Sequence, residues 1–387
     1  MPDSACGVSS DPNIISRDVK TIIPDVKTII IESHIPFVGD AFEGVAQTRI
    51  LTSEEITPES VRDADALLVR TYNRCDKALL DGSRVSFVGT ATIGTDHLDL
   101  DWLAANGIEA VNAPGCNAPA VAQWVLASIL TIYPRPEGMT VGIVGVGHVG
   151  TIVDAWCRRL GMKTLLCDPP RAEKEYGAPR NTNDCKPAPP ECGASEASAP
   201  SFVTLDEIAA RADIITFHTP HTRAPHPHAT HHLADARFFS LLKRKPMILN
   251  AARGPIIDTP ALIDAIDRGL VGHCAIDCWE GEPASISREL LDRADIGTFH
   301  IAGYSTEGKQ RATQAVVNAA LRHFGSDRRI DLGVPDGASV PVTKQAILDS
   351  YNPLDDTATL RAAIENGTPG FATLRNTYPL RHETGAC

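Results

Sequence analysis

The feature that most constrains the fold is the stretch GIVGVGHVG, residues 142–150, which leads from an apolar run into a helical segment. Gly145, Gly147 and Gly150 have the G-x-G-x-x-G spacing that binds a dinucleotide between a strand and a helix. Gly145 allows a tight turn, Gly147 lets the backbone approach a pyrophosphate, and Gly150 lets the helix pack closely on the strand. The free N–H groups of the helix N-terminus, at His148 and Val149, would face this anion.

An acidic residue stands at the end of the next strand-like run. Asp168 ends KTLLCD (163–168), where a carboxylate would accept hydrogen bonds from a ribose diol. The same carboxylate would repel a 2′-phosphate and therefore favours NAD over NADP. Arg171 argues the other way, because an arginine at this place can pair with that phosphate. A glycine-rich turn alone is weak evidence, so the prediction of an NAD site depends on the succession of strand, loop, helix and acid.

Strand-like and helical segments alternate around this motif, as in a doubly wound (Rossmann) α/β fold. One helical segment, DTPALIDAIDRG (258–269), has Asp258 or Thr259 as its cap, Pro260 in its first turn and Gly269 at its end. The strands of this series are predicted at TVGIVG (140–145), KTLLCD (163–168), DIITFHT (213–219), PMILNAA (246–252), GHCAID (272–277) and DIGTFH (295–300).

A shorter α/β series precedes it. The hexapeptide DVKTII occurs at 18–23 and again at 25–30, and only one copy can form the first strand. The second copy is the better candidate because it continues into IESHIPF, which leaves residues 1–24 as a predicted disordered extension. The further strands of this series are predicted at QTRIL (47–51), ALLVRT (66–71), VSFVGTAT (85–92) and IEAVNAP (108–114).

Three polar residues follow the predicted strands of the second series, at the edge of a parallel sheet where ligands bind: Arg253, Glu282 and His300. The oxidation of a 2-hydroxy acid needs a base for the hydroxyl proton, and histidine suits this role near neutral pH. A glutamate would hold the other imidazole nitrogen, and an arginine would hold a carboxylate with its planar fork. Taken singly, such a histidine is more often structural and such an arginine a surface charge; their coincidence on one edge favours catalysis.

The motifs GTATIGTDHLD, APGCNAPAVAQWV, NAARGPIID, DCWEGEP and DIGTFHIAGYSTEGK, together with the glycine-rich loop, resemble those of the D-isomer-specific 2-hydroxyacid dehydrogenases. The resemblance covers residues 27–325, with a weaker echo in GFATLRNTYPLRHE (370–383). It implies that Arg253 and Glu282 are catalytic and that His300 is the proton donor or acceptor. Within the family, GTDH, APGCN, CDPPR and WEGEP are most similar to a branch that oxidises a phosphorylated 2-hydroxy acid.

The same resemblance implies further site residues. Thr71 stands where the family usually has serine and keeps the hydroxyl. Arg70 and Arg74 are candidates for a phosphate contact, although a solvated surface role is equally open for each. The implied contacts to substrate are Thr71, Thr92 and Tyr304. The implied contacts to NAD, beyond the glycine-rich loop, are Asp168, Thr219, Ala251, Ala252, Arg253, Asp277 and Gly303.

The resemblance also implies a domain organisation. A flavodoxin-like substrate-binding domain would comprise residues 25–116 and 306–326, and the NAD-binding domain residues 117–305. Residues 327–387 would form a small unit similar to a dimerisation domain, shorter than in the family, and the protein would be a homodimer. Residues 183–200, rich in proline, alanine and serine, are expected to be a surface insertion.

Composition narrows the possible partners. The formal net charge of −12 argues against nonspecific binding to nucleic acid, which needs a basic surface. The apolar runs are shorter than the ~20 residues of a membrane span, and no signal peptide is recognised. The ten cysteines have no regular spacing, which indicates free thiols in a reducing cytoplasm.

The histidine-rich stretch 217–233 suggests a metal site, but its prolines and its lack of a thiol or carboxylate framework argue against one, and no metal is predicted. Two alternatives to the phosphorylated substrate stay open. The chain could be another D-2-hydroxyacid dehydrogenase, of phosphoglycerate or glyoxylate type. It could also be a nucleotide-sensing protein that keeps the fold without turnover.

Overall fold

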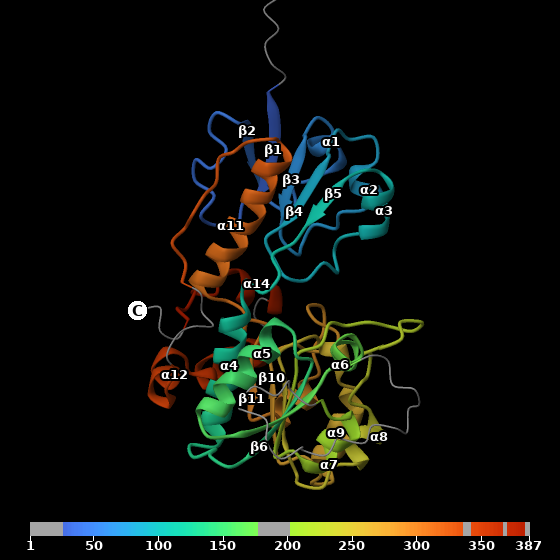
Figure 1. Ribbon diagram of the computed structural model, residues 1–387, viewed down its shortest axis with the longest axis vertical. Coiled ribbons are helices and arrows are strands. Elements are labelled where there is room, and N and C mark those ends of the chain that lie inside the picture. The colour runs from blue at the N-terminus through green and yellow to red at the C-terminus, as the bar shows by residue number, and fades with distance from the viewer. Residues whose placement is uncertain (1–25, 177–201, 336–341, 367–369, 384–387) are drawn as a thin grey trace, which may run out of the picture.

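Two lobes, each built on a parallel β-sheet, make up the protein in the computed structural model (Figure 1). The structure describes residues 26–176, 202–335, 342–366 and 370–383. The two lobes confirm the predicted α/β fold class. The predicted extension 1–24, the first DVKTII copy and the insertion 183–200 lie outside the described residues.

The first lobe has the strand order β2-β1-β3-β4-β5, which is the flavodoxin-like order. Its strands are β1 (Lys27–Glu32), β2 (Ala46–Leu51), β3 (Ala66–Val69), β4 (Phe87–Thr90) and β5 (Glu109–Val111). The second copy of DVKTII supplies β1, as predicted. The predicted strands 85–92 and 108–114 are longer than β4 and β5, and Ala91 and Thr92, which follow β4, line the space between the lobes.

Alternate strand residues of this sheet pack against helices on opposite faces. Ile29 and Leu68 belong to the cluster that α11 (Thr306–His323) covers with Val316 and neighbouring apolar residues. Ile30, Leu67 and Val69 belong to a second cluster, under the short helices α1 (Pro58–Val61), α2 (Lys77–Leu80) and α3 (Leu100–Ala105). The long helix α11 therefore returns from the second lobe to complete the first (Figure 1).

The second lobe has the parallel order β11-β10-β9-β8-β6-β7. An isolated bridge between Leu166 and Phe202 lies beyond β7, where the usual dinucleotide-binding order 3-2-1-4-5-6 places a further strand. The direction of the strand order therefore reverses between β6 and β8. Each of the six predicted runs contains a strand, although the last strand is much shorter than its run. The strands are β6 (Thr140–Val144), β7 (Lys163–Cys167), β8 (Ile214–Phe217), β9 (Met247–Asn250), β10 (His273–Ile276) and β11 (Ile296–Gly297).

Helices cover both faces of this sheet. In α4, thirteen of the fifteen residues are buried, since this helix lies between the sheet and the C-terminal segment. In α9 the cap is Asp258, whose side chain accepts a hydrogen bond from Ala261 N–H. The helices are α4 (Ala118–Ile132), α5 (His148–Arg159), α6 (Pro169–Tyr176), α7 (Leu205–Arg211), α8 (Ala236–Ser240), α9 (Thr259–Asp267) and α10 (Arg288–Arg293), with a 3-10 turn at Gly254–Ile256.

The predicted strand 295–300 is wrong in its second half. β11 ends at Gly297, and the backbone of His300 has a positive φ of 59°, which a strand does not permit. The chain turns there because the Asp277 carboxylate accepts hydrogen bonds from Thr298 Oγ1 and from Ile301 N–H, at 2.6 and 2.8 Å. His300 therefore lies in a loop beyond the sheet rather than at a strand end.

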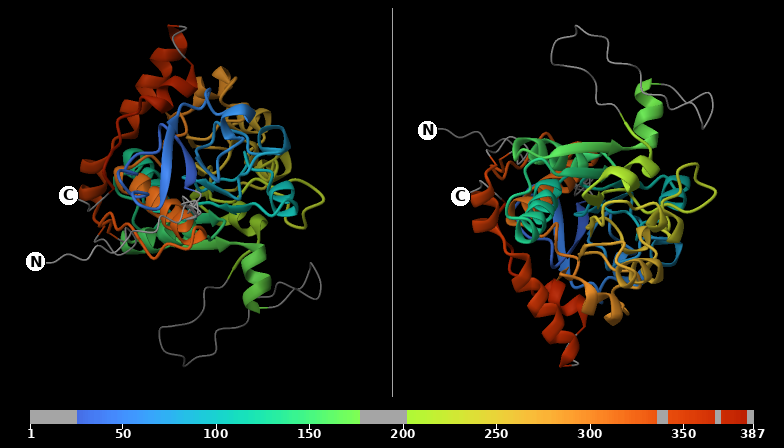
Figure 2. Two further views of the ribbon diagram at one scale, coloured as in Figure 1. Left: turned by 90° about the horizontal axis from the view of Figure 1, so that it is seen from above. Right: turned by 90° about the horizontal axis from the view of Figure 1, so that it is seen from below.

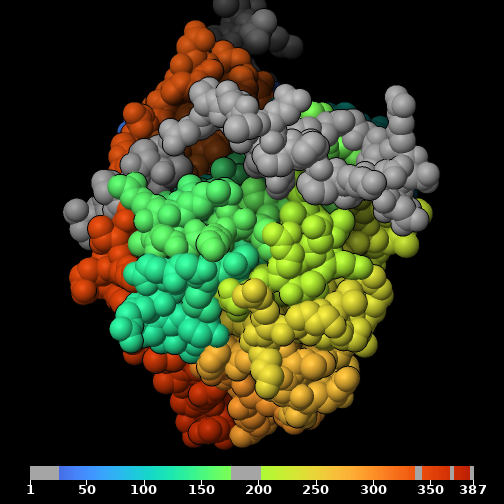
Figure 3. All heavy atoms as spheres, turned by 60° about the horizontal axis from the view of Figure 1, so that its bottom comes forward, coloured from blue at the N-terminus to red at the C-terminus, as the bar shows by residue number. Residues whose placement is uncertain are grey.

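The described residues after 341 form helices that pack on the second lobe (Figures 2 and 3). These helices are α12 (Lys344–Ser350), α13 (Pro353–Glu365) and α14 (Phe371–Asn376). Helix α12 contacts α4, and Thr357 of α13 accepts a hydrogen bond from Gly297 N–H of β11. A dimerisation role for this segment stays a prediction.

Two further observations bear on the sequence analysis. Within the described ranges no helix is long and apolar enough to cross a membrane. The cysteines of these ranges are buried free thiols, as predicted: Cys75, Cys116, Cys157, Cys167, Cys274 and Cys278.

A buried histidine gives the first lobe a predictable sensitivity to acid. Burial lowers the pKa of His97 from 6.5 to about 4, against a smaller opposing effect of Asp96, and its Nε2 lies 3.0 Å from Thr90 Oγ1. Between these two pH values the unfolded chain binds a proton that the folded chain does not. We therefore expect the free energy of unfolding to fall from pH 6.5 to pH 4, by roughly 3 kcal/mol from this group.

Urea denaturation over a pH series measures this dependence. His97→Gln should flatten the decrease, whereas His226→Gln, at an exposed histidine, should keep the decrease of the unmodified protein. Equal slopes in all three proteins would show that His97 is not the group responsible.

Candidate active site

A cleft of about 570 Å³ lies between the two lobes, within the size range of small-molecule sites. Gly115, Gly147 and His148 also line a second hollow of about 560 Å³, so the two hollows adjoin at the start of α5. Arg171 lines the second hollow and His300 lines the cleft. The predicted residues that line the cleft are Thr71, Thr92, Gly147, His148, Val149, Thr219, Ala251, Ala252, Arg253, Asp277, His300, Gly303 and Tyr304.

The glycine-rich loop has the geometry that its sequence predicts. Gly145 has a φ of +91°, and a Cβ there would lie 2.8 Å from the His218 carbonyl oxygen across the strand-order reversal. A Cβ at Gly150 would overlap the Gly145 carbonyl, which shows how closely α5 packs on β6. Gly147 faces open space and caps α5 without a side-chain hydrogen bond, so the first N–H groups of the helix are available to a phosphate.

The acid at the end of β7 is held beside this loop. Asp168 Oδ2 accepts a hydrogen bond from Val146 N–H at 2.7 Å, and Oδ1 accepts one from Arg171 N–H at 3.0 Å. The Arg171 guanidinium donates to the Val146 carbonyl at 2.8 Å and pairs with Glu175 at 2.6 Å. Because both ends of this guanidinium have partners, the alternative that Arg171 recognises a 2′-phosphate loses support.

Unpartnered polar atoms also fit a bound dinucleotide. Thr219 Oγ1 and Asn117 Oδ1 are buried and lack a hydrogen-bond partner within the described part of the chain, and both residues line the cleft. A buried hydroxyl or amide without a partner is destabilising unless a ligand satisfies it. Together with the open backbone at Gly147, these atoms fit the amide and hydroxyl groups of NAD.

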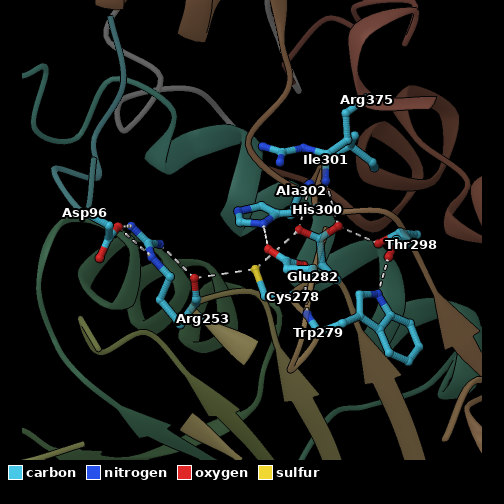
Figure 4. A network of polar contacts seen from close by, with 12 residues as sticks. Asp96, Arg253, Cys278, Trp279, Glu282, Thr298, His300, Ile301, Ala302 and Arg375 are labelled. Atoms are coloured by element: carbon cyan, nitrogen blue, oxygen red, sulfur yellow. Dashed lines mark hydrogen bonds and ion pairs between the residues drawn. The ribbon is translucent and has the colours of Figure 1, made fainter. Parts of the chain in front are cut away.

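His300 lines the cleft and forms a pair with Glu282, which lies behind it and does not line the cleft (Figure 4). His300 Nδ1 is hydrogen bonded to Glu282 Oε1, and Glu282 Oε2 accepts from Trp279 N–H at 2.9 Å. The two side chains are 27% and 16% exposed, so the imidazole can still meet a substrate. Burial alone would raise the pKa of Glu282, but the charge and hydrogen bond of His300 and the Trp279 N–H together lower it. Glu282 is therefore ionised at neutral pH and holds the imidazole through Nδ1, which leaves Nε2 for a proton.

Arg253 reaches across the cleft to the first lobe. Its Nη1 donates to the Ala252 carbonyl at 2.8 Å, and its Nη2 lies 3.2 Å from Asp96 Oδ2, in the loop after β4 (Figure 4). The following Gly254 has no room for a Cβ, which would overlap the Trp279 carbonyl. The close passage of these two segments brings Arg253 and the 279–282 loop onto the same side of the cleft.

Asp277 is buried beneath this site and holds the His300 loop. Its carboxylate accepts hydrogen bonds from Thr298, Ile301 and Ala302, and its carbonyl accepts one from His300 N–H at 2.9 Å. Asp277 thus positions the imidazole, whereas its contact with NAD stays a prediction.

The candidates for substrate contact differ in their positions. Thr71 is exposed and Thr92 Oγ1 lies 3.0 Å from the Gly94 carbonyl, both at the wall that the first lobe gives to the cleft. Tyr304 accepts hydrogen bonds at its hydroxyl from Arg70 Nη2 and from Arg375 Nη2, each at 3.3 Å. Arg70 therefore lies in the cleft.

For Arg74 two roles were predicted as equally open, a phosphate contact and a solvated surface charge, and the structure supports the surface role. The Arg74 side chain is 71% exposed and pairs with Asp76 at 2.8 Å, on the outside of the first lobe. The turn after β3 separates the two arginines, so that only Arg70 points into the cleft.

Three of the aspartate, lysine and arginine residues that line the cleft were not predicted as site residues: Asp96, Lys309 and Arg375. Asp96 and Lys309 belong to the motifs GTDH and STEGK, which were noted for their resemblance and not for these side chains. Arg375 lies in α14 and enters the cleft from a segment predicted to serve dimerisation. Its only signal was the basic composition of LRNTYPLRHE, which is equally typical of a solvated helix.

Histidines of the stretch 217–233 form hydrogen bonds to separate partners and do not converge on one point. His228 Nε2 lies 3.0 Å from Glu173, His232 Nε2 lies 2.7 Å from Glu280, and His221 Nε2 lies 3.1 Å from His231 Nδ1. His218 follows β8, lies 3.0 Å from Thr216 Oγ1 and has its pKa lowered to about 3 by burial.

The sequence matches the family model of the D-isomer specific 2-hydroxyacid dehydrogenase NAD binding domain over residues 122–302. The erythronate-4-phosphate dehydrogenase of Bacteroides thetaiotaomicron is 40% identical over 368 residues, which cover 92% of this chain and 97% of the relative. The erythronate-4-phosphate dehydrogenase of Escherichia coli is 37% identical over 373 residues, which cover 92% of each chain.

Solved structures with lower identity share the fold. D-lactate dehydrogenase from Aquifex aeolicus, complexed with NAD and lactic acid, has a TM-score of 0.59 at 22% identity and covers 77% of this chain and 96% of its own. A glyoxylate reductase from Paecilomyes thermophila has a TM-score of 0.61 at 20% identity and covers 79% of this chain and 98% of its own. The family match and the fit of the glycine-rich loop confirm NAD as the cofactor.

A pair of glycine variants separates close packing from backbone strain. Gly145 and Gly138 both have positive φ, +91° and +81°, but a Cβ meets the β8 segment at Gly145 and nothing within 4 Å at Gly138. We expect Gly145→Ala to weaken NADH binding at least about tenfold, because the loop must move away from the phosphate position. Gly138→Ala should destabilise the fold by about 1 kcal/mol and leave NADH affinity unchanged.

Fluorescence titration with NADH, together with thermal unfolding, checks both variants. Equal affinities in the two variants would contradict the role assigned to the loop.

Proposed function

Since the chain belongs to the family of D-isomer specific 2-hydroxyacid dehydrogenases, we propose that it uses NAD to oxidise 4-phospho-D-erythronate to (R)-3-hydroxy-2-oxo-4-phosphooxybutanoate. The relatives named erythronate-4-phosphate dehydrogenase support this substrate, because the similarity extends over 97% and 92% of their lengths. The reaction would be a step in the synthesis of pyridoxal 5′-phosphate. The observation that carries the proposal is the His300–Glu282 pair, whose imidazole lines the cleft together with Arg253 and the glycine-rich loop.

His300 is the base of this reaction. Its Nε2 accepts the proton of the C2 hydroxyl while the C2–H bond breaks and its electron pair leaves as hydride, so that C2 becomes a carbonyl. Bound NAD supplies the hydride acceptor. Glu282, on the Nδ1 side, keeps the ring in one orientation and stabilises the imidazolium that forms.

Arg253 is the anchor for the C1 carboxylate. Its Nε and Nη2 donate to one Asp96 oxygen, at 3.4 and 3.2 Å, and therefore already hold a carboxylate in the cleft. Asp96 is 66% exposed, so that it can turn toward solvent when a substrate carboxylate takes the same two donors. The fork of Arg253 would then fix the distance between the C2 hydroxyl and His300.

A substrate panel tests the proposal. With NAD, kcat/KM for 4-phospho-D-erythronate should exceed that for 3-phospho-D-glycerate and D-lactate by at least about tenfold, the effect of one charge-assisted contact. Glyoxylate with NADH tests the reductase alternative in the opposite direction. A higher kcat/KM on another acid would reassign the substrate, and NAD binding without turnover on any of them would favour a binding protein.

Glu282 gives a second test, with its neighbour as control. Glu282→Gln should lower kcat at least about tenfold, because a neutral amide no longer stabilises the imidazolium. Glu280→Gln, which removes a carboxylate that pairs with His232, should keep the kcat of the unmodified protein. Equal kcat values in both variants would remove Glu282 from the mechanism.

We infer a homodimer in the cytoplasm from the sequence alone. The assembly and the location are predictions that size-exclusion chromatography with light scattering and cell fractionation can check.

A further inference from the structure

Three basic side chains from distant parts of the chain meet at one end of the cleft. Arg70 follows β3, Lys309 lies in α11 and Arg375 lies in α14. Both arginines donate to the Tyr304 hydroxyl, at 3.3 Å each, and Lys309 Nζ lies 4.2 Å from the centre of the Tyr304 ring. All four residues line the same cleft as His300. We refer to Arg70, Lys309 and Arg375 as the basic cluster.

No ion pair compensates the charges of the basic cluster in the described part of the protein, where Glu282 acts on Arg375 and Glu32 on Lys309 only from beyond ion-pair distance. None of its members forms an ion pair with a described carboxylate, although such pairs are common elsewhere in the chain. Arg70 is only 7% exposed, and the Nε atoms of Arg70 and Arg375 are buried without a hydrogen-bond partner among the described residues. Buried charges without partners are destabilising, so this arrangement favours a ligand that brings negative charge and several acceptors.

The electrostatics of Lys309 agree with this geometry. Burial, together with the nearby charges of Arg70 and Arg375, lowers the pKa of Lys309 to about 7, against opposing effects of Cys116 and Glu32. An anion between the three groups would reverse this effect and keep the ammonium charged. The negative charge of the ligand would then offset the repulsion between the three positive side chains.

We propose that Arg70, Lys309 and Arg375 form a subsite for the phosphate group of the substrate, a phosphate monoester dianion. The inference rests on the proposed function, because it names the part of the site that distinguishes a phosphorylated 2-hydroxy acid from a plain one. Two guanidinium groups and an ammonium group match the charge and the acceptor oxygens of a phosphate.

The position of the subsite fits the two ends of the proposed substrate. Figure 4 shows the His300 imidazole between Arg253 on one side and Arg375 on the other. The carboxylate on Arg253 and the phosphate in the basic cluster would therefore place C2 at the imidazole. Tyr304 and Arg375 approach from segments outside the NAD-binding lobe's sheet, so the subsite needs the C-terminal helix α14 to be docked.

Substitutions that remove charge and keep length test the subsite. Arg375→Met, Lys309→Met and Arg70→Met are compared with Arg74→Met, which removes an exposed arginine four positions after Arg70. The assay measures kcat/KM for 4-phospho-D-erythronate and for D-erythronate, which lacks the phosphate. In each cluster variant the ratio of the two values should fall on the order of 10- to 100-fold, and in Arg74→Met it should stay at the level of the unmodified protein. Equal losses on both substrates, or unchanged ratios, would overturn the subsite.

Direct binding keeps the test independent of turnover. Calorimetric titration of the NADH-bound protein with inorganic phosphate should show binding that each cluster variant weakens at least about tenfold and that Arg74→Met leaves unchanged. If the unmodified protein binds phosphate through the cluster but does not oxidise 4-phospho-D-erythronate, the proposed function fails and the subsite stands. If the unmodified protein oxidises the ester, but the cluster variants keep its phosphate affinity and its ratio of kcat/KM values, the subsite fails and the function stands. Circular dichroism and thermal unfolding show that the variants are folded.

Discussion

The site depends on one buried carboxylate. Asp277, at the end of β10 and 1% exposed, accepts hydrogen bonds from Thr298 Oγ1 and from the N–H groups of Ile301 and Ala302. These bonds end β11 early and hold His300 in a left-handed conformation that a non-glycine residue adopts only under constraint. Without that turn, His300 would continue along the sheet and could not meet Glu282. A residue inside the fold thus decides where the reactive imidazole lies.

The cleft itself is a product of the whole chain. The second lobe supplies the glycine-rich loop, Arg253 and His300, the first lobe supplies Asp96 and Arg70, and the C-terminal segment supplies Arg375. Arg381 strengthens this assembly, because its guanidinium donates to the carbonyls of Ile301 and Ala120. A protein with a net charge of −12 therefore concentrates positive charge at one place, where an anionic ligand would otherwise be repelled by the overall field.

Short sequence patterns were sufficient to predict most of the strands and helices and part of the candidate site. The six strand-like runs of the second lobe, the roles of Gly145 and Gly150, and the cap at Asp258 depend on residues close in sequence, and the structure agrees with each. The length of β11 was wrong, because its end depends on hydrogen bonds to a side chain from β10. The choice between Arg70 and Arg74 was open, because both lie in one turn and only packing against Tyr304 distinguishes them.

The sequence by itself determined the α/β class and the dinucleotide-binding loop, because hydrophobic periodicity and turn geometry depend on residues close together in the chain. It also predicted Glu282 and His300 as an acid–base pair from their side-chain chemistry. Only the tertiary structure decided that Lys309 and Arg375 join Arg70 in the cleft. The physical reason is distance along the chain: α11 crosses back to the first lobe and α14 docks beside it through burial of their apolar faces. No short sequence pattern indicates which charged side chain points into the cleft once these helices have packed.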